Sequence, residues 1–527
     1  MQKRLIIAVG LSMFILVLFQ QFQGPATGPA GEGQETASQE NAVDKRETIN
    51  RTEKEPEGKV EKKPGQEREK TQPGNGDLDS LQAVEISAHD LTLTLNNSDS
   101  GLTSLVMIDK DGSEVELVRD KVLDLYPLFL DAGVEGKWDI NRIGEGTARA
   151  EISDGAISAV RIYRISGDDR INIENRVKNI SGSSRRIELR QGWPGGLGTT
   201  ENLRKENYGE NKLFAKIDNK VIDKLKEESY EGQVNWGGVL NRYFIVSFLD
   251  IDDLFVKVRG SNIGGRSAGC GSSVPEDAEF PGIIFSGSAT LNKGEEYRFN
   301  QEVYAGLKEY KVLKELNEDM DEVLSFGIFG FLSRIFLSIL IWFESLVGNY
   351  GVAIIILTFL LQIIIFPLTK KSFKSMQAMK DLQPKMTSIR EKFKDDPQRM
   401  NQEIMVLYKK HKVNPFGGCL PLLLQMPIFI SLFTMLRSVA ELRYAGFLWI
   451  HNLARQDVLF ASIPVIKDIP FIGGAGPLPF LMGGAMFLQQ KMTGGTEGSQ
   501  KNLTYIMPVM FTFLFMKFPS GLVLYWL

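Results

Sequence analysis

Two long apolar segments constrain the fold of this chain more than any other feature. Residues 350–368 and 416–436 contain no charged side chain, although 24% of the 527 residues are charged. Such a run comes close to the roughly 20 apolar residues that cross a bilayer as a helix. We therefore expect a helical membrane protein whose soluble parts hold most of the charges.

Polar side chains interrupt these apolar segments. Gln362 lies within TFLLQIIIFPLTKKS, Thr358 lies one turn earlier, Gln425 is central in the second segment, and Thr504 opens a later one. An amide without a partner in the bilayer costs several kcal/mol. A single amide is explained by an interhelical hydrogen bond worth about 0.6–2 kcal/mol. Several amides on neighbouring short helices are explained equally well by a wet cavity.

The N-terminal region predicts an anchor followed by a linker. Two basic residues precede an apolar run over 5–19, a pattern typical of a cleavable signal peptide or of an uncleaved anchor. The next residues, QQFQGPATGPAGEG, lack a convincing cleavage site. We expect residues 1–23 to be a transmembrane anchor with a cytoplasmic N-terminus. Residues 24–78, rich in Gly, Pro and charges, predict a disordered linker.

Residues 79–310 have a different pattern, in which apolar and polar residues alternate. Segments such as ISAVRIYRIS and RINIENRVKNIS are separated by Gly, Asn, Asp and Ser clusters. Period-two alternation in many short segments is typical of a β-sandwich. Because this domain follows an anchor that enters from the cytoplasm, we expect it to lie outside the cytoplasm.

Residues 325–345 are long enough to span a membrane, but they include Arg334 and Glu344. If they spanned it, the highly basic segment 369–415 would lie outside the cytoplasm, against the positive-inside rule. We therefore expect an amphipathic helix at the outer interface. The core, residues 346–527, then has five spans. They are expected at about 346–368, 416–436, 470–489, 503–518 and 519–527, the last of these incomplete.

The basic segment 369–415 predicts a cytoplasmic helical hairpin. Apolar residues recur every three or four positions, with Met376, Met379 and Met386 among them, and KDDPQ supplies the turn, with Asp396 as N-cap and Pro397 opening the second helix. The methionines fit a seam between two helices or a pliable surface for varied apolar partners. The basic residues fit anionic lipid or ribosomal RNA. Among these basic residues we single out Lys380, Lys385 and Arg390.

Motifs of nucleotide, dinucleotide and metal chemistry are missing from the sequence. We find neither a phosphate-binding glycine loop nor a Cys/His cluster. We therefore expect no catalytic residue, cofactor, metal or small-molecule substrate.

The segments KVNPFGGCLPLLLQMPIF, FPLTKKS, LQPKM, QEIMVLYK and FPSGLVLYW resemble the Oxa/Alb family of membrane-protein insertases. The order of elements resembles its Gram-negative bacterial form. The resemblance implies a multi-pass protein of the bacterial inner membrane with a periplasmic β-supersandwich. It implies a chaperone that inserts and helps to fold nascent membrane proteins, alone or with the Sec translocon. The implied partners are nascent membrane proteins, the lipid bilayer, the ribosome and the Sec translocon.

The resemblance also implies a hydrophilic groove that opens to the cytoplasm and to lipid. The family usually carries an arginine in its first core span, and Gln362 stands at that position here. Tyr525 and Trp526 would offer the client an amphipathic contact. The expected groove residues are Gln362, Thr358, Gln425, Thr504, Tyr525 and Trp526.

Two other functions compete with this one. A transporter would need ionisable residues at membrane depth or repeated halves, and we find neither. A membrane-tethered carbohydrate-binding module would act through residues 79–310, where His89 is the only histidine. We rank the insertase first, the binding module second and the transporter last.

Overall fold

The computed structural model describes residues 82–118, 125–198, 211–264, 279–411, 413–414, 420–463, 474–493 and 500–527. The anchor expected at 1–23 and the linker expected at 24–78 lie outside the described residues. Residues 383–407 belong to a different compact unit from residues 80–382 and 408–527. We therefore describe the two units separately.

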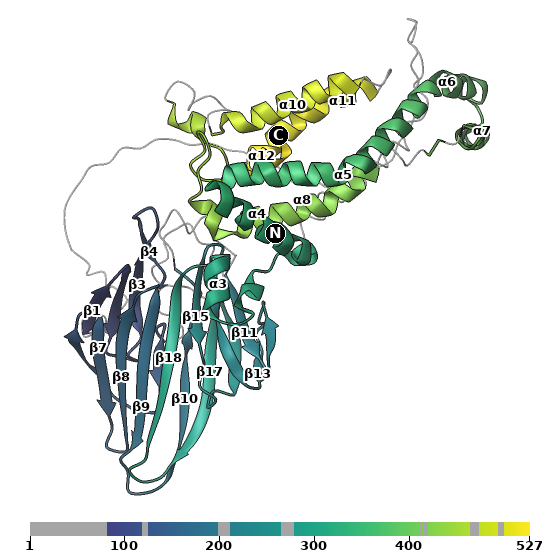
Figure 1. Cartoon of the computed structure of the whole chain (residues 1–527). Helices are drawn as coiled ribbons and strands as arrows, with labels where there is room; N and C mark the ends of the chain where they lie inside the picture. Colours follow the sequence, from purple (N-terminus) through teal and green to yellow (C-terminus); the bar gives the residue numbers. More distant parts are fainter. Residues whose placement is uncertain are drawn as a thin grey trace, which may run out of the picture. The chain divides into compact units, whose positions relative to one another are not determined.

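The β-domain, from β1 to β18, contains three antiparallel sheets (Figure 1). The nine-stranded sheet has the order β12 (Lys220–Ile222), β11 (Lys212–Ile217), β14 (Val234–Leu240), β15 (Phe244–Leu249), β18 (Glu296–Leu307), β9 (Arg170–Asn179), β8 (Ile157–Ser166), β7 (Thr147–Ser153) and β6 (Asp139–Gly144). The five-stranded sheet has the order β13 (Ser229–Glu231), β16 (Lys257–Gly264), β17 (Glu279–Leu291), β10 (Arg185–Trp193) and β5 (Phe129–Asp131). The four-stranded sheet comprises β1 (Ala83–Ala88), β2 (Leu91–Asn96), β3 (Leu102–Ile108) and β4 (Glu114–Glu116).

The nine- and five-stranded sheets pack face to face, so the expected sandwich is confirmed. Along β8 and β9 every second residue is buried, as the alternation of the sequence predicts. Between the sheets, Phe248 of β15 meets Phe285 of β17 with ring centroids 5.2 Å apart. Gln191 Nε2 of β10 donates to Gln301 Oε1 of β18 at 2.8 Å. The core therefore contains polar groups that bond to one another.

Arg161 is the most unexpected residue of this core, because β8 turns it inward and leaves it 1% exposed. Its guanidinium donates to Asn175 Oδ1 at 2.9 Å, to Ser100 Oγ at 2.9 Å and to the Leu128 carbonyl at 2.7 Å. Burial lowers the pKa of Arg161. This side chain joins three separate segments of the β-domain.

The helices follow the β-domain in the chain. They are α3 (Tyr310–Leu316), η2 (Met320–Val323), η3 (Gly327–Phe329), α4 (Gly330–Val347), α5 (Tyr350–Asp381), α6 (Gln383–Lys392), α7 (Pro397–Lys410), α8 (Leu420–Ser438), η5 (Ala440–Arg443), η6 (Leu459–Ser462), α10 (Pro477–Thr493), α11 (Gln500–Phe515) and α12 (Ser520–Trp526). We call α4, α5, α8, α10, α11 and α12 the helical core.

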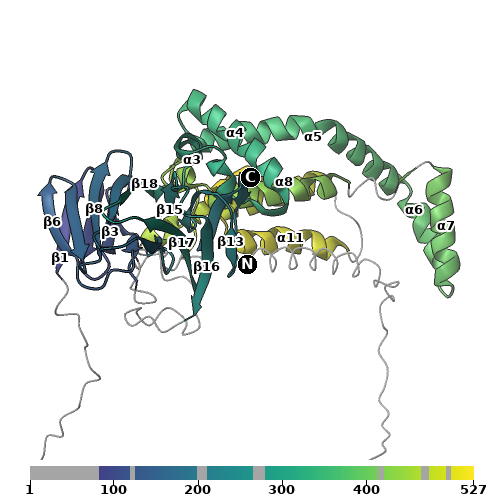
Figure 2. The same cartoon turned by 90° about the horizontal axis from the view of Figure 1, so that it is seen from below.

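Within the described residues, two helices are long and apolar enough to cross a membrane. They are Gly327–Val347 and Tyr350–Asp381, with mean hydropathies of 1.6 and 2.6. Leu423–Ser438 and Ile506–Phe515 are shorter apolar helices. Both α4 and α8 lie against α5 (Figures 1 and 2).

The start of α5 is held by the loop that follows α8. Asn349 caps the helix, since its side chain accepts hydrogen bonds from the backbone N–H groups of Gly351 and Val352. The same side chain donates to the Gly446 carbonyl at 3.1 Å. A Cβ atom at Gly351 would lie 2.3 Å from the Phe447 ring, so only glycine fits. The N-terminus of α5 is therefore held in a fixed position.

One helix boundary of the hairpin region lies at a predicted signal, the KDDPQ turn. Helix α5 ends at Asp381 and α6 begins at Gln383, with Pro384 in its first turn, where proline is tolerated. Helix α7 begins at Pro397, and the backbone N–H of Arg399 donates to Asp396 Oδ1 at 3.0 Å. The predicted N-cap is thus confirmed.

Candidate functional site

A buried polar pair joins two helices of the helical core. Gln425 Nε2 of α8 donates to Tyr525 Oη of α12 at 2.6 Å. The Tyr525 side chain is 5% exposed and Gln425 is half-buried. One oxygen and one amide therefore satisfy each other within apolar surroundings, as an interhelical bond does in a bilayer. The structure brings together these two residues, which lie a hundred positions apart in the sequence.

Thr358 and Gln362 lie one turn apart on α5, beside its buried face. That face carries Ile354, Leu357 and Leu361. Thr358 Oγ1 donates to the Ile354 carbonyl at 2.8 Å, so the hydroxyl is satisfied within its own helix. Gln362 is exposed, and we find no hydrogen bond from its amide to any described residue. Gln362 is therefore not hydrogen-bonded to the Gln425–Tyr525 pair.

Trp526, at the end of α12, lies in an aromatic cluster with α8 and α11. Its ring centroid is 5.3 Å from that of Phe429, 5.4 Å from Phe515 and 6.4 Å from Phe511. The indole is half-buried by these rings. Thr504 lies in α11, but its side chain is outside the described part of the structure.

The sequence analysis missed a second set of polar contacts in the helical core. Ser333 of α4 is fully buried, and its Oγ lies 3.0 Å from the Ser431 carbonyl and 3.3 Å from Thr434 Oγ1 of α8. Small hydroxyl residues three positions apart, as in SLFT, are a signal for close helix packing that could have identified this contact.

Helices α10 and α11 approach each other closely at a glycine. A Cβ atom at Gly483 would lie 2.0 Å from Thr512 Oγ1, and Thr512 is 8% exposed. The Thr512 hydroxyl donates to the Pro508 carbonyl, one turn earlier in the same helix, at 2.8 Å, so the hydroxyl is satisfied within α11. Both contacts are typical of helices packed in a membrane.

The hairpin residues singled out from the sequence fall on two helices. Met376, Met379 and Lys380 lie in the last turns of α5 and are half-buried. In α6, Met386 is half-buried, whereas Lys385 and Arg390 are exposed. Neither α6 nor α7 has a fully buried residue.

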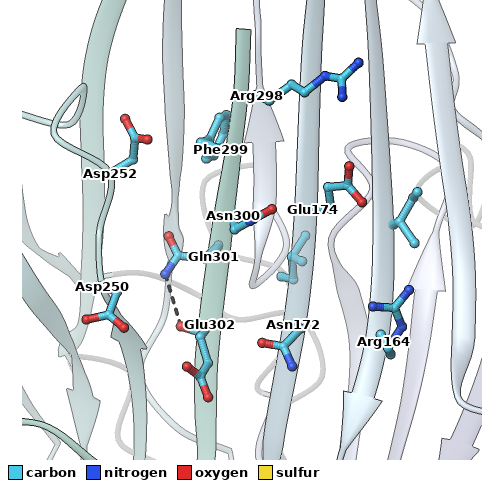
Figure 3. Close-up of a pocket in the computed structure, with 12 residues that line it drawn as sticks. Arg164, Asn172, Glu174, Asp250, Asp252, Arg298, Phe299, Asn300, Gln301 and Glu302 are labelled. Atoms are coloured by element: carbon cyan, nitrogen blue, oxygen red, sulfur yellow. Dashed lines mark hydrogen bonds between the residues drawn. The ribbon is translucent and has the colours of Figure 1, made fainter.

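A surface groove of about 810 Å³ lies on the β-domain (Figure 3). The side chains that face it come mainly from neighbouring strands β8, β9 and β18, with Asp250 and Asp252 from the segment after β15. The labelled residues are mainly charged or amide side chains: Arg164, Asn172, Glu174, Asp250, Asp252, Arg298, Asn300, Gln301 and Glu302, with Phe299 beside them.

Several of the charged side chains in this groove already have partners within the β-domain. Glu302 Oε1 lies 2.7 Å from Arg170 and Glu174 Oε1 lies 2.5 Å from Arg176. Tyr297 Oη donates to Asp252 Oδ1 at 2.6 Å. The one aromatic residue that lines the groove, Phe299, is only 3% exposed, so it offers no platform on which a sugar ring could stack.

Comparison with known proteins gives matches over most of the chain. The family described as 60Kd inner membrane protein matches residues 342–527, and the YidC periplasmic domain matches residues 159–339. The "Membrane protein insertase YidC" of Endomicrobium trichonymphae is 34% identical over 86% of this chain and 85% of its own length. The chain belongs to the YidC family of membrane protein insertases.

A second relative and a solved structure are also similar to this chain. The insertase of Syntrophobacter fumaroxidans is 48% identical, over 45% of this chain and 42% of its own. The crystal structure of YidC from Thermotoga maritima covers 84% of this chain and 96% of its own, with 13% identity and a TM-score of 0.31.

The two YidC family segments correspond to different parts of the structure. The periplasmic-domain match begins within β8 and reaches α4, so the β-sandwich is the periplasmic domain. The 60Kd match contains α5, α8, α10, α11 and α12, and hence the Gln425–Tyr525 pair. The relatives are named as insertases, which agrees with the expectation that the chain is not an enzyme.

Proposed function

We propose that this chain inserts nascent proteins into the inner membrane and helps them to fold there. The observation that carries the proposal is the 34% identity, over 86% of the chain, to a protein named as a membrane protein insertase. The helical core supports it, because polar side chains occur there on helices that are otherwise apolar.

The polar side chains of α5, α8 and α12 form the path for the hydrophilic part of the client in this proposal. A polar tail crossing hydrocarbon loses several kcal/mol for each unpaired group. The exposed Gln362 amide offers a donor and an acceptor at mid-helix, and Thr358 lies one turn away. Gln425, Tyr525 and Thr504 would line the same wet groove, which opens to the cytoplasm. Gln362 replaces the usual arginine, so the groove attracts acidic tails less strongly.

The apolar part of the client leaves the groove sideways into lipid. Exposed apolar side chains of α5, such as Phe359 at 65% and Ile363 at 68%, present a lipid-like surface for this step. Trp526 and Tyr525 add an amphipathic contact at the end of α12. Each methylene that the client buries contributes about 0.8 kcal/mol, so the step needs no nucleotide.

The topology of the proposal places the N-terminus in the cytoplasm and the β-domain in the periplasm. The core crosses the membrane five times, and α4 lies at the outer interface. An interfacial α4 agrees with the half-buried position of Glu344 and with that of Arg334, whose Nη1 lies 3.9 Å from Glu322 Oε1. Helix α11, with 16 residues, is short against the ~20 needed for a full span. Short helices thin the bilayer that the client must cross.

The cytoplasmic hairpin, residues 369–415, meets the ribosome or the Sec translocon in this proposal. Exposed Lys385 and Arg390 suit the phosphates of RNA or anionic lipid. Half-buried Met386 suits apolar client segments, since methionine adapts to varied partners.

Cysteine scanning tests the groove directly. Positions 355–365 and 420–430 would be replaced one at a time, in a background without Cys270 and Cys419, and labelled with an impermeant thiol reagent from the cytoplasmic side. We expect position 362 to react and the buried position 361 to stay unreactive. If no cysteine at mid-helix reacted with the reagent while the purified protein still inserted clients, the proposal of a wet groove would be wrong.

Deletion of residues 375–412 tests the hairpin. We expect weaker insertion of clients, while the remaining helices still accumulate in the membrane. Unchanged insertion would show that the hairpin has no role in the mechanism.

A carbohydrate-binding role for the β-domain ranks second. The groove of Figure 3 is the feature that favours it, but its paired charges and buried Phe299 argue for a solvated sheet face. Isothermal titration with neutral oligosaccharides tests this role, and millimolar or tighter binding would restore it.

A further inference from the structure

The segment that follows α8 is held by the β-domain at several points. This segment, residues 437–444, comprises the last turn of α8, helix η5 and Tyr444. It meets the end of β3, the turn between β14 and β15, and the start of α3. These three places are far apart in the sequence, so the contact is a specific arrangement of the fold.

A buried ion pair forms the centre of this contact. Arg443 Nη2 lies 3.1 Å from Asp109 Oδ2, and the two side chains are 6% and 0% exposed. Tyr444 Oη donates to the same carboxylate oxygen. The Lys110 backbone N–H donates to the other oxygen, Oδ1, at 2.9 Å. The carboxylate is therefore fully occupied by partners from both sides of the contact.

Aromatic rings surround the Arg443 guanidinium. Its Cζ atom lies 5.0 Å from the ring centroid of Tyr243 and 5.1 Å from those of Phe244 and Tyr444. Arg443 Nη1 has no hydrogen-bond partner among the described residues, so the faces of these rings accommodate that side of the cation. Lysine cannot replace such a planar, stacked cation without loss.

Two further contacts flank this centre. Arg242 Nε donates to the Arg437 carbonyl at 3.1 Å, which caps the C-terminus of α8 with a positive charge. On the other side, Glu441 Oε1 accepts a hydrogen bond of 2.7 Å from the backbone N–H of Tyr310, the first residue of α3. The β-domain thus caps the end of α8, and the segment that follows α8 caps the start of α3, the first helix after the β-domain.

We propose that Arg443 is a positioning residue, which through Asp109 ties the outer end of α8 to the β-domain and so holds the polar pair of α8 and α12 in place. The proposal rests on the insertase function given above. Gln425 precedes Arg437 by twelve residues, which is about 18 Å along a helix at 1.5 Å per residue. A tilt at the outer end of α8 therefore displaces the Gln425 amide, which has to stay within hydrogen-bonding distance of Tyr525.

The test uses the full chain in bilayers of phosphatidylethanolamine and phosphatidylglycerol. Hydrogen exchange of residues 437–446 is compared for the native protein, Asp109→Asn, Arg443→Gln and the double variant. We expect at least tenfold faster exchange in each single variant, because one buried charge loses its partner. The double variant should exchange more slowly than either single variant, since neither charge remains.

Insertion of a single-span client with a charged tail is measured on the same samples. We expect each single variant to insert it several-fold more slowly, with partial recovery in the double variant. The matched control is Arg149→Gln, which breaks an exposed pair with Glu151 and should change neither measurement. If Asp109→Asn fails to accumulate, Tyr444→Phe removes one bond to the carboxylate and should give a smaller effect in the same direction.

Two results would overturn the proposal. Unchanged exchange in both single variants would show that the ion pair does not hold the segment. Faster exchange with normal insertion would show that the contact does not position α8 for the client. Failure of the native protein to insert any client would instead refute the proposed function, whatever the exchange rates.

Discussion

The β-domain and the helical core treat their polar side chains in opposite ways. In the β-domain, Arg161 and Gln301 are buried and each bonds to several partners. In the helical core, the Gln362 amide lies on an exposed surface of α5 between apolar neighbours. The first arrangement stabilises a fold. The exposed Gln362 amide contributes little to folding. Its role therefore has to be sought in the molecules that contact α5.

The Gln425–Tyr525 pair lies between these two extremes. It is satisfied like a core network, yet it contains only a single hydrogen bond and one half-buried partner. In the function proposed above, a polar group of the client would compete for this bond. Comparing the effects of substitutions in the two regions therefore separates folding from function.

The largest effect should come from Arg161→Leu, which leaves the partners of the guanidinium buried without a donor. We expect the β-domain to lose about 3–5 kcal/mol of unfolding free energy, since each buried group without a partner costs about 1–3 kcal/mol. Urea unfolding followed by fluorescence of the buried Trp193 and Trp236 measures it. Arg164→Leu, on the exposed side of the same strand, should stay within about 0.5 kcal/mol. Equal losses would contradict the structural role of Arg161.

The next effect depends on pH and concerns Glu441, where the two regions meet. Burial, together with the nearby negative charge of Glu309, raises the pKa of Glu441 from 4.5 to about 7. The folded state therefore favours the protonated acid, so this contribution is complete below pH 4.5, is lost between pH 4.5 and about 7, and stays constant above. We expect it to be about 1–3 kcal/mol.

Denaturant titrations of the full chain at several pH values measure this contribution as the difference between the native protein and Glu441→Gln. The difference should vary between pH 4.5 and 7 and be flat at higher pH. A difference that is independent of pH would show that Glu441 titrates normally.

A smaller effect is expected in the helical core, from Gln425→Leu and Tyr525→Phe. Interhelical hydrogen bonds in membranes contribute about 0.6–1.7 kcal/mol, so a double-mutant cycle should give a coupling in this range. Unfolding in mixed micelles supplies the free energies. Both variants should also slow the insertion of clients with charged tails. A coupling near zero would mean that the bond does not persist in the membrane.

The smallest effect on stability should come from Gln362→Leu, which we expect to be within about 0.5 kcal/mol. Insertion of clients with charged tails should nevertheless fall about threefold relative to neutral clients, or ~0.7 kcal/mol. Ile363→Leu, at an exposed neighbouring site, is the control. Gln362→Arg should be tolerated if water reaches the site. Equal slowing of both client classes would reduce Gln362 to a packing residue.

Local signals in the sequence predicted much of the fold. Alternation identified β8 and β9 as strands with one buried face, and Asp396 with Pro397 marked the start of α7. These features depend on neighbours within a few residues, which periodicity and capping describe. The division into a β-sandwich and a helical region followed from the same patterns.

Long-range partners could not be predicted in this way. Nothing in the residues around Asp109 indicates that its carboxylate contacts Arg443. The burial of Arg161 is equally unexpected, because a charged side chain is normally exposed. The resemblance drew attention to Gln362, Gln425 and Tyr525, but only the structure shows that the last two bond and the first does not bond to them. Such pairs depend on how distant segments pack, which no local pattern encodes.

The close approach at Gly483 has an evolutionary consequence. A Cβ atom at this position would lie 2.0 Å from Thr512 Oγ1, well inside van der Waals contact, so a larger residue requires the Thr512 side chain or the two helices to shift. A related protein that inserts bulkier clients is therefore expected to have gained space elsewhere, through smaller side chains beside α5 or α12. Glycine should predominate at position 483, and a serine or alanine there should appear only together with a smaller residue at position 512.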